Sequence, residues 1–226
     1  MLEARGLSKR FGRTAVLSDA AFSVREGEIL GLIGPNGAGK TTLFEILAGL
    51  LPADAGHVTF RGALVPPARR KEVLYYVPDA VRPWRDQRVT QVLTLFEEIY
   101  RTDSSAIVAR LELDALCRSR LGALSKGELK RLTIAIGLLT PHPLLLLDEP
   151  FDGLDFRQTR DVMEVLREAR RTLFLSIHQL TDAARVCDRL VLLSRGRVVG
   201  EGPLDELRSR AGVGGGGLEE VFLALT

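Results

Sequence analysis

A glycine-rich segment from Gly34 to Thr42 constrains the fold more than any other part of the chain. It reads G-P-N-G-A-G-K-T-T and satisfies the pattern G-x-x-x-x-G-K-[ST]. An apolar run at 29–33 precedes it, and a helix-like segment at 42–48 follows it. This order predicts a strand, a phosphate-binding loop and a helix. The alternative is a plain glycine turn between a strand and a helix.

The chemistry of polyphosphate explains these residue types. Glycines let backbone N–H groups approach a dense anion, and the N-terminus of the next helix adds a partial positive charge. Lys40 supplies a mobile cation for the outer phosphates, and the Thr41 hydroxyl can ligate Mg²⁺. The predicted nucleotide-binding residues of the loop are Gly34, Pro35, Asn36, Gly37, Ala38, Gly39, Lys40, Thr41 and Thr42.

A second nucleotide signature lies at Asp148 and Glu149, which follow four consecutive leucines at 144–147. A continuously apolar run is typical of a central parallel strand that is covered on both faces. A carboxylate at the end of such a strand can hold Mg²⁺ through its water shell, which predicts this role for Asp148. Glu149 is placed to take a proton from an attacking water. The alternatives are a strand-end cap for Asp148 and a solvated carboxylate for Glu149.

Composition limits the partners. The chain has 226 residues, which suits one large domain or a core with a modest insertion, and its net charge is only +2. Nothing in this charge argues for a nucleic-acid partner, and none is expected. Seven Arg or Lys residues against three acids at 61–88 form a local basic excess, which is a solvated face or a contact with a partner or acidic headgroups.

Cysteine use and hydropathy indicate a reduced compartment and no membrane span. Cys117 and Cys187 are isolated, as expected of reduced residues in a cytosolic protein. The N-terminus lacks the apolar core of a signal peptide. The longest apolar region, 138–147, is interrupted at 140–143, so no transmembrane segment is expected. A role at a membrane would therefore need a separate membrane protein.

Strand-like and helix-like segments alternate along the chain, which predicts an α/β fold. We expect a P-loop NTPase core with a mainly parallel sheet, an N-terminal antiparallel β part and a helical insertion. The predicted strands lie at 2–7, 20–24, 29–33, 58–60 (an edge strand), 73–77, 144–147 and 172–177, and a hairpin is predicted at 190–199. The predicted helices lie at 42–48, within 79–121, from 124 to about 139, at 158–170 and at 218–225.

The order of the motifs resembles the ATP-binding subunit of ABC transporters over nearly the whole chain. The family's L-S-G-G-Q signature is matched as L-S-K-G-E by Leu124, Ser125, Lys126, Gly127 and Glu128. Gly153, Leu154 and Asp155 look like its D-loop, and His178 looks like its switch histidine. On this resemblance, residues 1–212 form the ATPase domain with a helical subdomain inserted at about 79–121, and 213–226 form a Gly-rich linker and a short C-terminal helix.

The resemblance implies a shared active site. Two chains would pair head to tail, with each ATP between the P-loop of one chain and the signature of the other. Ser125 and the Gly127 backbone would bind the γ-phosphate of the partner's ATP, and Asp155 would bridge the two sites. The implied catalytic residues are Glu149, His178 and Lys40. The implied cofactors are ATP and Mg²⁺, with Thr41 and Asp148 as Mg²⁺ ligands.

Three positions depart from the family pattern. Phe11 stands where the family has a tyrosine that stacks on adenine, and the alternative for it is a plain core phenylalanine. Lys126 and Glu128 replace a glycine and a glutamine of the signature. Asp79 replaces a glutamine, so we expect it to tune the contact with Mg²⁺ and the coupling to a membrane subunit. An acidic residue here, together with the tail at 218–226, resembles the drug-export branch.

The favoured function is the motor subunit of a transporter, with an exporter favoured over an importer. The implied partners are a second copy of the chain and a polytopic membrane permease, which would hold it at the cytoplasmic face of the cell membrane and contact it near 82–101. The alternative is a soluble ABC-type ATPase in an assembly or repair role. A GTPase is disfavoured because no N-K-x-D or T-K-x-D motif follows the loop, and a degenerate binding module is disfavoured by the intact motifs.

Overall fold

The computed structural model describes residues 1–79 and 84–226, and its centre is a six-stranded sheet of order β10-β9-β3-β8-β7-β6. Five strands run parallel, and β10 pairs antiparallel with β9 as the predicted terminal hairpin. The strands are β3 (Ile29–Ile33), β6 (Leu74–Val77), β7 (Leu144–Asp148), β8 (Thr172–Ile177), β9 (Arg189–Ser194) and β10 (Arg197–Gly202). The predicted fold class, a mainly parallel α/β core with an antiparallel part, is confirmed.

A second, antiparallel sheet has the order β2-β1-β4-β5. Its strands are β1 (Leu2–Phe11), β2 (Thr14–Val24), β4 (Ala55–Phe60) and β5 (Ala63–Leu64). The prediction of an edge strand at 58–60 was wrong, because β4 pairs with β1 on one side and with the two-residue β5 on the other. β1 and β2 also extend beyond the predicted segments, since Lys9, Arg10 and Phe11 pair with β2 across a hairpin.

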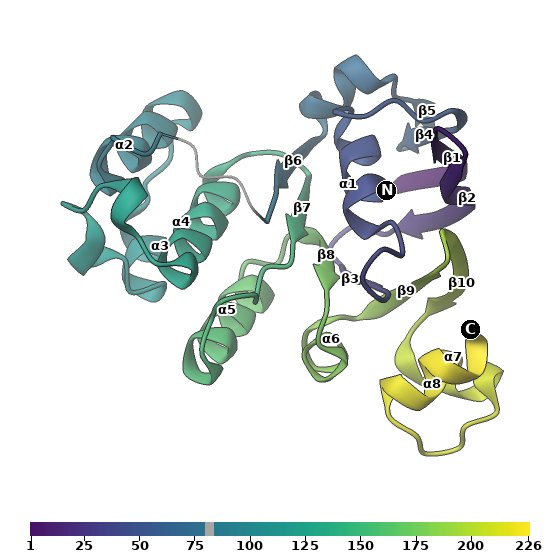
Figure 1. Cartoon of the computed structure of the whole chain (residues 1–226). Coiled ribbons are helices and arrows are strands. Elements are labelled where there is room, and N and C mark those ends of the chain that lie inside the picture. The colour runs from purple at the N-terminus through teal and green to yellow at the C-terminus, as the bar shows by residue number, and fades with distance from the viewer. Residues whose placement is uncertain (80–83) are drawn as a thin grey trace.

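Helix α1 (Lys40–Ala48) packs between the two sheets, as Figure 1 shows. Phe44 of α1 is fully buried, with its ring centroid 5.0 Å from that of Phe174 on β8. Phe174 in turn lies 5.3 Å from Phe22 of the antiparallel sheet. These aromatic contacts join the three layers into one apolar core, which fixes the N-terminus of α1 at the edge of the parallel sheet.

The helices after β6 form a separate lobe of the molecule (Figure 1). It contains α2 (Val89–Tyr100) and α3 (Ser105–Arg110), and both pack on α4 (Lys126–Leu139). Apolar residues of α2 at helical spacing, among them Val92 and Phe96, are buried against this core. The expected partner contact at 82–101 begins at Arg82, which lies outside the described residues.

Four helices complete the parallel-sheet side, and two of them, α6 and α7, were not predicted. They are α5 (Phe156–Glu168), α6 (Leu180–Val186), α7 (Leu204–Ala211) and α8 (Leu218–Leu225). Helix α8 buries Leu218 and Val221 and contacts α6 and α7. Among the described residues, none of the helices combines the length and the apolar character that crossing a membrane requires.

Candidate active site

Four strands of the parallel sheet bring the predicted site residues to one edge. The glycine loop follows β3, His178 follows β8, Asp148 ends β7, and Asp79 lies two residues beyond β6. Because β3, β8, β7 and β6 are neighbours and run parallel, their carboxyl ends meet. A cleft of about 290 Å³ opens there, and its lining includes Asn36, Asp79, Glu149 and His178.

Lys40 lies at the first position of α1 with its side chain curled into the loop. It is 7% exposed, and its ammonium donates a hydrogen bond to the Gly34 carbonyl at 2.8 Å. The loop needs glycine at two points. Gly39 has φ 104°, and a side chain at Gly34 would meet the Leu193 carbonyl oxygen at 2.4 Å. The buried cation is therefore held at the centre of the loop.

Part of the glycine loop faces outward, whereas Ala38 and Gly39 are buried. Pro35, Asn36 and Gly37 are exposed, and the Ala38 N–H donates to the Pro35 carbonyl in a tight turn. Thr41 is exposed as well, and Thr42 is half-buried on the first turn of α1. These positions form an open rim of backbone and small side chains around the Lys40 ammonium.

Asp148 is buried, and its carboxylate has three hydroxyl donors. Oδ2 accepts from the Thr41 and Tyr76 hydroxyls at 3.2 Å each, and Oδ1 accepts from Ser176. Burial, and next the negative charge of Asp148, raise the pKa of Tyr76 well above its usual value, so its hydroxyl stays a donor. The network orients Asp148 toward Thr41, so the carboxylate oxygen of Asp148 and the hydroxyl oxygen of Thr41 lie side by side.

Glu149 has a left-handed backbone, with φ 48°, which is uncommon for a residue that carries a side chain. Its N–H donates to both the Oγ (3.0 Å) and the carbonyl oxygen (3.2 Å) of Ser176, which supports this conformation. The carboxylate lies 3.7 Å from the Lys40 ammonium. Burial is the main reason that the pKa of Glu149 is raised. The charge of Lys40 and, less strongly, that of His178 lower this pKa, whereas the charge of Asp148 raises it.

The signature segment begins α4. Ser125 is the N-cap residue, and its hydroxyl accepts from the Glu128 N–H at 3.2 Å while the Glu128 carboxylate accepts from the Ser125 N–H at 2.7 Å. Glu128, a departure from the family pattern, thus completes a capping box. Lys126, the other departure, forms an exposed ion pair with Asp152. Leu124 is buried behind the cap.

The D-loop segment packs directly on the signature of the same chain. A side chain at Gly127 would meet the Gly153 carbonyl oxygen at 2.7 Å, and Gly153 itself has φ 82°. Leu154 is half-buried beside this contact. Asp155 is exposed and caps α5, where it accepts from the Gln158 N–H at 2.8 Å. The glycines therefore set the spacing between two segments that the sequence keeps 25 residues apart.

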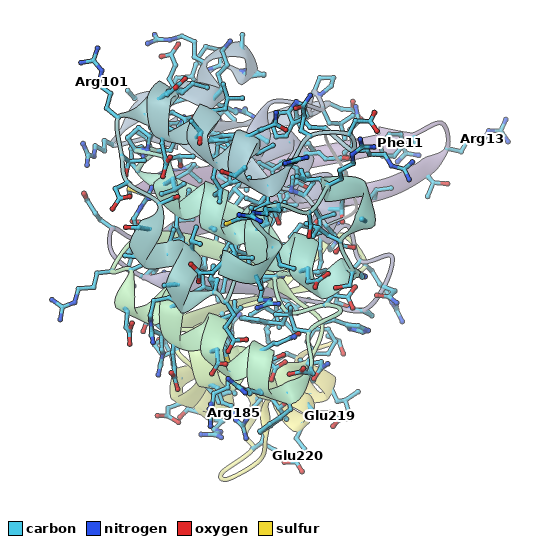
Figure 2. The ribbon with its side chains drawn as sticks, turned by 90° about the vertical axis from the view of Figure 1, so that its left-hand side faces the viewer. Phe11, Arg13, Arg101, Arg185, Glu219 and Glu220 are labelled. Carbon is cyan, nitrogen blue, oxygen red and sulfur yellow. The ribbon has the colours of Figure 1, made fainter. Side chains whose placement is uncertain are left out.

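Phe11 is not a core residue, which rules out the alternative considered for it. It ends β1, is 50% exposed and lies under the Lys9 ammonium, which is 5.6 Å from the ring centroid. Figure 2 shows Arg13 at the tip of the same hairpin, with Phe11 close to it. The ring is therefore accessible for stacking.

His178 is exposed at the end of β8 and lines the cleft.

Three polar residues at this site were missed. Tyr76 and Ser176 hold Asp148, and Lys130 of α4 is a buried cation that donates to Asp79. Ser176 carried a signal in the sequence, because it is the one polar residue in the apolar run at 173–177. Lys130 carried no such signal, because it lies off the apolar stripe of the signature helix and is followed by a second basic residue, Arg131.

A family model described as "ABC transporter" matches residues 17–152, a range that runs from before the glycine loop to beyond Glu149. The chain belongs to the ABC transporter family. It is an ATP-binding subunit and an ATPase of that family. An uncharacterised ABC transporter ATP-binding protein of Methanocaldococcus jannaschii is 33% identical to this ABC ATPase, over 91% of this chain and 79% of that protein.

Two further comparisons agree. The Nod factor export ATP-binding protein I of Burkholderia orbicola is 36% identical, over 89% of this ABC ATPase and 70% of that protein. A solved structure described as the ATP-binding subunit of an ABC transporter superposes with a TM-score of 0.90 at 30% identity, over 100% of this chain and 99% of that one. The whole ABC ATPase fold, including the C-terminal helices, is therefore shared with a known ATP-binding subunit.

Proposed function

We propose that this ABC ATPase is the Mg²⁺-dependent motor of an exporter and works as a head-to-tail dimer on a separate membrane subunit. The observation that carries the proposal is the meeting of Lys40, Thr41, Asp148, Glu149 and His178 at one edge of the parallel sheet. This set contains a phosphate cation, oxygen donors for a metal and a carboxylate base, which are the groups that phosphoryl transfer to water requires.

The loop and α1 would bind the phosphates. The Lys40 ammonium now donates to the Gly34 carbonyl and can turn to the outer phosphates when they enter the loop. The exposed backbone at 35–37 and the N-terminus of α1 add further N–H donors. Phosphate binding by this chain therefore needs little rearrangement beyond one side chain.

Thr41 and Asp148 fit Mg²⁺. Within residues 1–79 and 84–226, no group of three or more His, Cys, Asp or Glu side chains is positioned to hold a metal. Mg²⁺ commonly takes one or two protein oxygens and completes its shell with waters and phosphate oxygens. The hydroxyl and the carboxylate, 3.2 Å apart, match that requirement. The ion would neutralise charge on the phosphates when bound.

Glu149 is proposed as the general base. A carboxylate with a raised pKa is a stronger base, and Glu149 faces the cleft beside Lys40. Its carboxylate would take the proton from a water that attacks the terminal phosphate. His178, exposed on the neighbouring strand end, would hold that phosphate and the water in line.

The second copy of the chain would complete the site. Ser125 starts the 14-residue α4, whose N-terminal N–H groups suit a γ-phosphate. Gly127 is packed against Gly153, so the signature and the D-loop would move together as the dimer closes. Asp155, exposed beside them, would contact the partner chain. This arrangement supports one ATP between each loop and the opposite signature.

The names of the relatives support export. The Burkholderia relative is named a Nod factor export protein. In this chain, the acidic residue Asp79 and the tail at 218–226 resemble the drug-export branch. A membrane partner would hold the chain at the inner face of the cell membrane. Which substrate is exported would be decided by that partner and not by this chain.

Affinity capture tests the transporter role. A tagged Glu149→Gln variant would be incubated with ATP, Mg²⁺ and detergent-solubilised membranes of the native organism, with Lys40→Met as the matched control that cannot hold the nucleotide. Recovery of a stoichiometric polytopic membrane protein with Glu149→Gln alone is expected. Recovery of soluble assembly factors alone would instead favour the alternative role in assembly or repair.

Phe11 tests the adenine contact. Phe11→Ala should weaken ATP binding about 5- to 150-fold, because stacking of a base on an aromatic ring contributes ~1–3 kcal/mol. Phe11→Tyr, which keeps the ring, should bind as the wild type does. Equilibrium titration with a fluorescent ATP analogue gives both affinities. Equal affinity of Phe11→Ala and the wild type would contradict the stacking role.

A further inference from the structure

Lys130 is a buried cation that none of the motifs accounts for. It lies on α4 and is 4% exposed. Its ammonium donates to the Asp79 carboxylate at 2.7 Å and to the Asp148 carbonyl at 3.2 Å. A lysine is almost never buried to this degree unless it is paired, since desolvation of the ammonium costs several kcal/mol. The partner that offsets this cost is Asp79.

Asp79 needs a partner for its own reason. Its side chain is 30% exposed and lines the cleft together with Glu149 and Asn36. An isolated carboxylate there would repel a polyphosphate that enters the cleft. The Asp79–Lys130 pair carries no net charge, so in charge it is equivalent to a neutral amide side chain at this position of the wall.

We propose that Lys130 is a positioning residue that holds the Asp79 carboxylate at the cleft wall and cancels its charge, so that polyphosphate can bind beside an acidic residue. The proposal rests on the nucleotide site proposed above. Lys130 lies five residues beyond Ser125 on the same helix. The ion pair thus also connects the nucleotide cleft of one chain to the helix that would face the partner's ATP.

The charge model predicts opposite effects for the two single variants. Lys130→Met keeps the length of the side chain but leaves the carboxylate uncompensated, so the dissociation constant for nucleotide should rise about tenfold or more. Asp79→Asn leaves an uncompensated ammonium at the cleft, so the dissociation constant should fall about threefold. The double variant is neutral and should bind within about threefold of the wild type.

The experiment measures binding and thermal unfolding of the full chain. The probe is a fluorescent non-hydrolysable ATP analogue, mant-AMPPNP, with Mg²⁺ and with EDTA. Lys71→Met is the matched control, because Lys71 is an exposed lysine outside the lining of the cleft. It should leave the dissociation constant within about twofold of the wild type, since an exposed charge away from the cleft is screened by solvent.

Each outcome separates the charge role from a merely structural one. The proposal would be overturned if both Lys130→Met and Asp79→Asn lowered the melting temperature while nucleotide binding was unchanged, or was weakened equally, in the two variants. Lys130 would then only stabilise the packing of α4 against the segment that follows β6. If Lys130→Met does not fold, the sign of the change in Asp79→Asn still decides. Failure of the wild type to bind the analogue would instead refute the nucleotide site itself.

Discussion

Glu149→Gln is expected to lower the ATPase rate by about 10²–10⁴-fold while ATP still binds, the range that loss of a general base produces. The amide keeps the size and the left-handed backbone of Glu149 but cannot accept a proton from water. The Lys40 ammonium and the Gly34 carbonyl are untouched by this change, so the phosphates keep their cation. This variant should therefore bind ATP but hydrolyse it much more slowly than the wild type does.

The measurement compares steady-state phosphate release with ATP retention and oligomeric state in size-exclusion chromatography. With ATP and Mg²⁺ the variant should elute as a dimer that holds unhydrolysed ATP. Glu164→Gln, which changes an exposed carboxylate on α5, is the control and should hydrolyse ATP at the wild-type rate. A loss smaller than about tenfold in Glu149→Gln would assign the base to another group.

The parts of the site that the sequence predicted are those whose chemistry is local. The glycine loop with Lys40 and the apolar strand that ends at Asp148 are contiguous patterns, and each places its functional group at the end of a strand that runs parallel to its neighbours. The structure brings these groups together at the expected edge. Their distances, such as 3.2 Å from Thr41 to Asp148, follow from packing of α1 against the sheet.

The parts that were missed depend on pairing between distant segments. Ser176 reaches Asp148 only because the register of β7 and β8 sets the two residues opposite each other. Lys130 finds Asp79 across 51 positions of sequence, so a buried ion pair could not be inferred from either segment. The internal position of β4 likewise depends on which strand pairs with β1, and local propensity does not encode that choice.

Ser125→Asp is expected to abolish ATPase activity without disrupting α4. Aspartate is as good an N-cap as serine, so the helix start should survive, whereas the added charge would face the γ-phosphate of the partner's ATP. Ser125→Asn, an equally good cap without the charge, is the matched control and should keep more activity than Ser125→Asp. Thermal unfolding of the three proteins would verify that the capped helix is intact.

Mixing two inactive variants then tests whether the sites are shared. Lys40→Met lacks the phosphate cation and Ser125→Asp lacks a usable signature, so each homodimer has two defective sites. In a mixed dimer, one site combines the intact Lys40 of one chain with the intact Ser125 of the other. After random exchange of equal amounts, about a quarter of all sites are whole, and the mixture should show about a quarter of the wild-type rate.

The two arrangements predict different numbers in that mixture. If each chain used its own Ser125, every site would carry one defect and the mixed rate would equal the mean of the two separate rates. Gly127 packs on Gly153, so the signature and the D-loop of a chain form one continuous surface. In the shared-site arrangement, this surface covers the nucleotide that is bound to the glycine loop of the other chain. We therefore expect the mixture of the two variants to regain ATPase activity. A chain that carries both Lys40→Met and Ser125→Asp should have no activity, because none of its sites is whole.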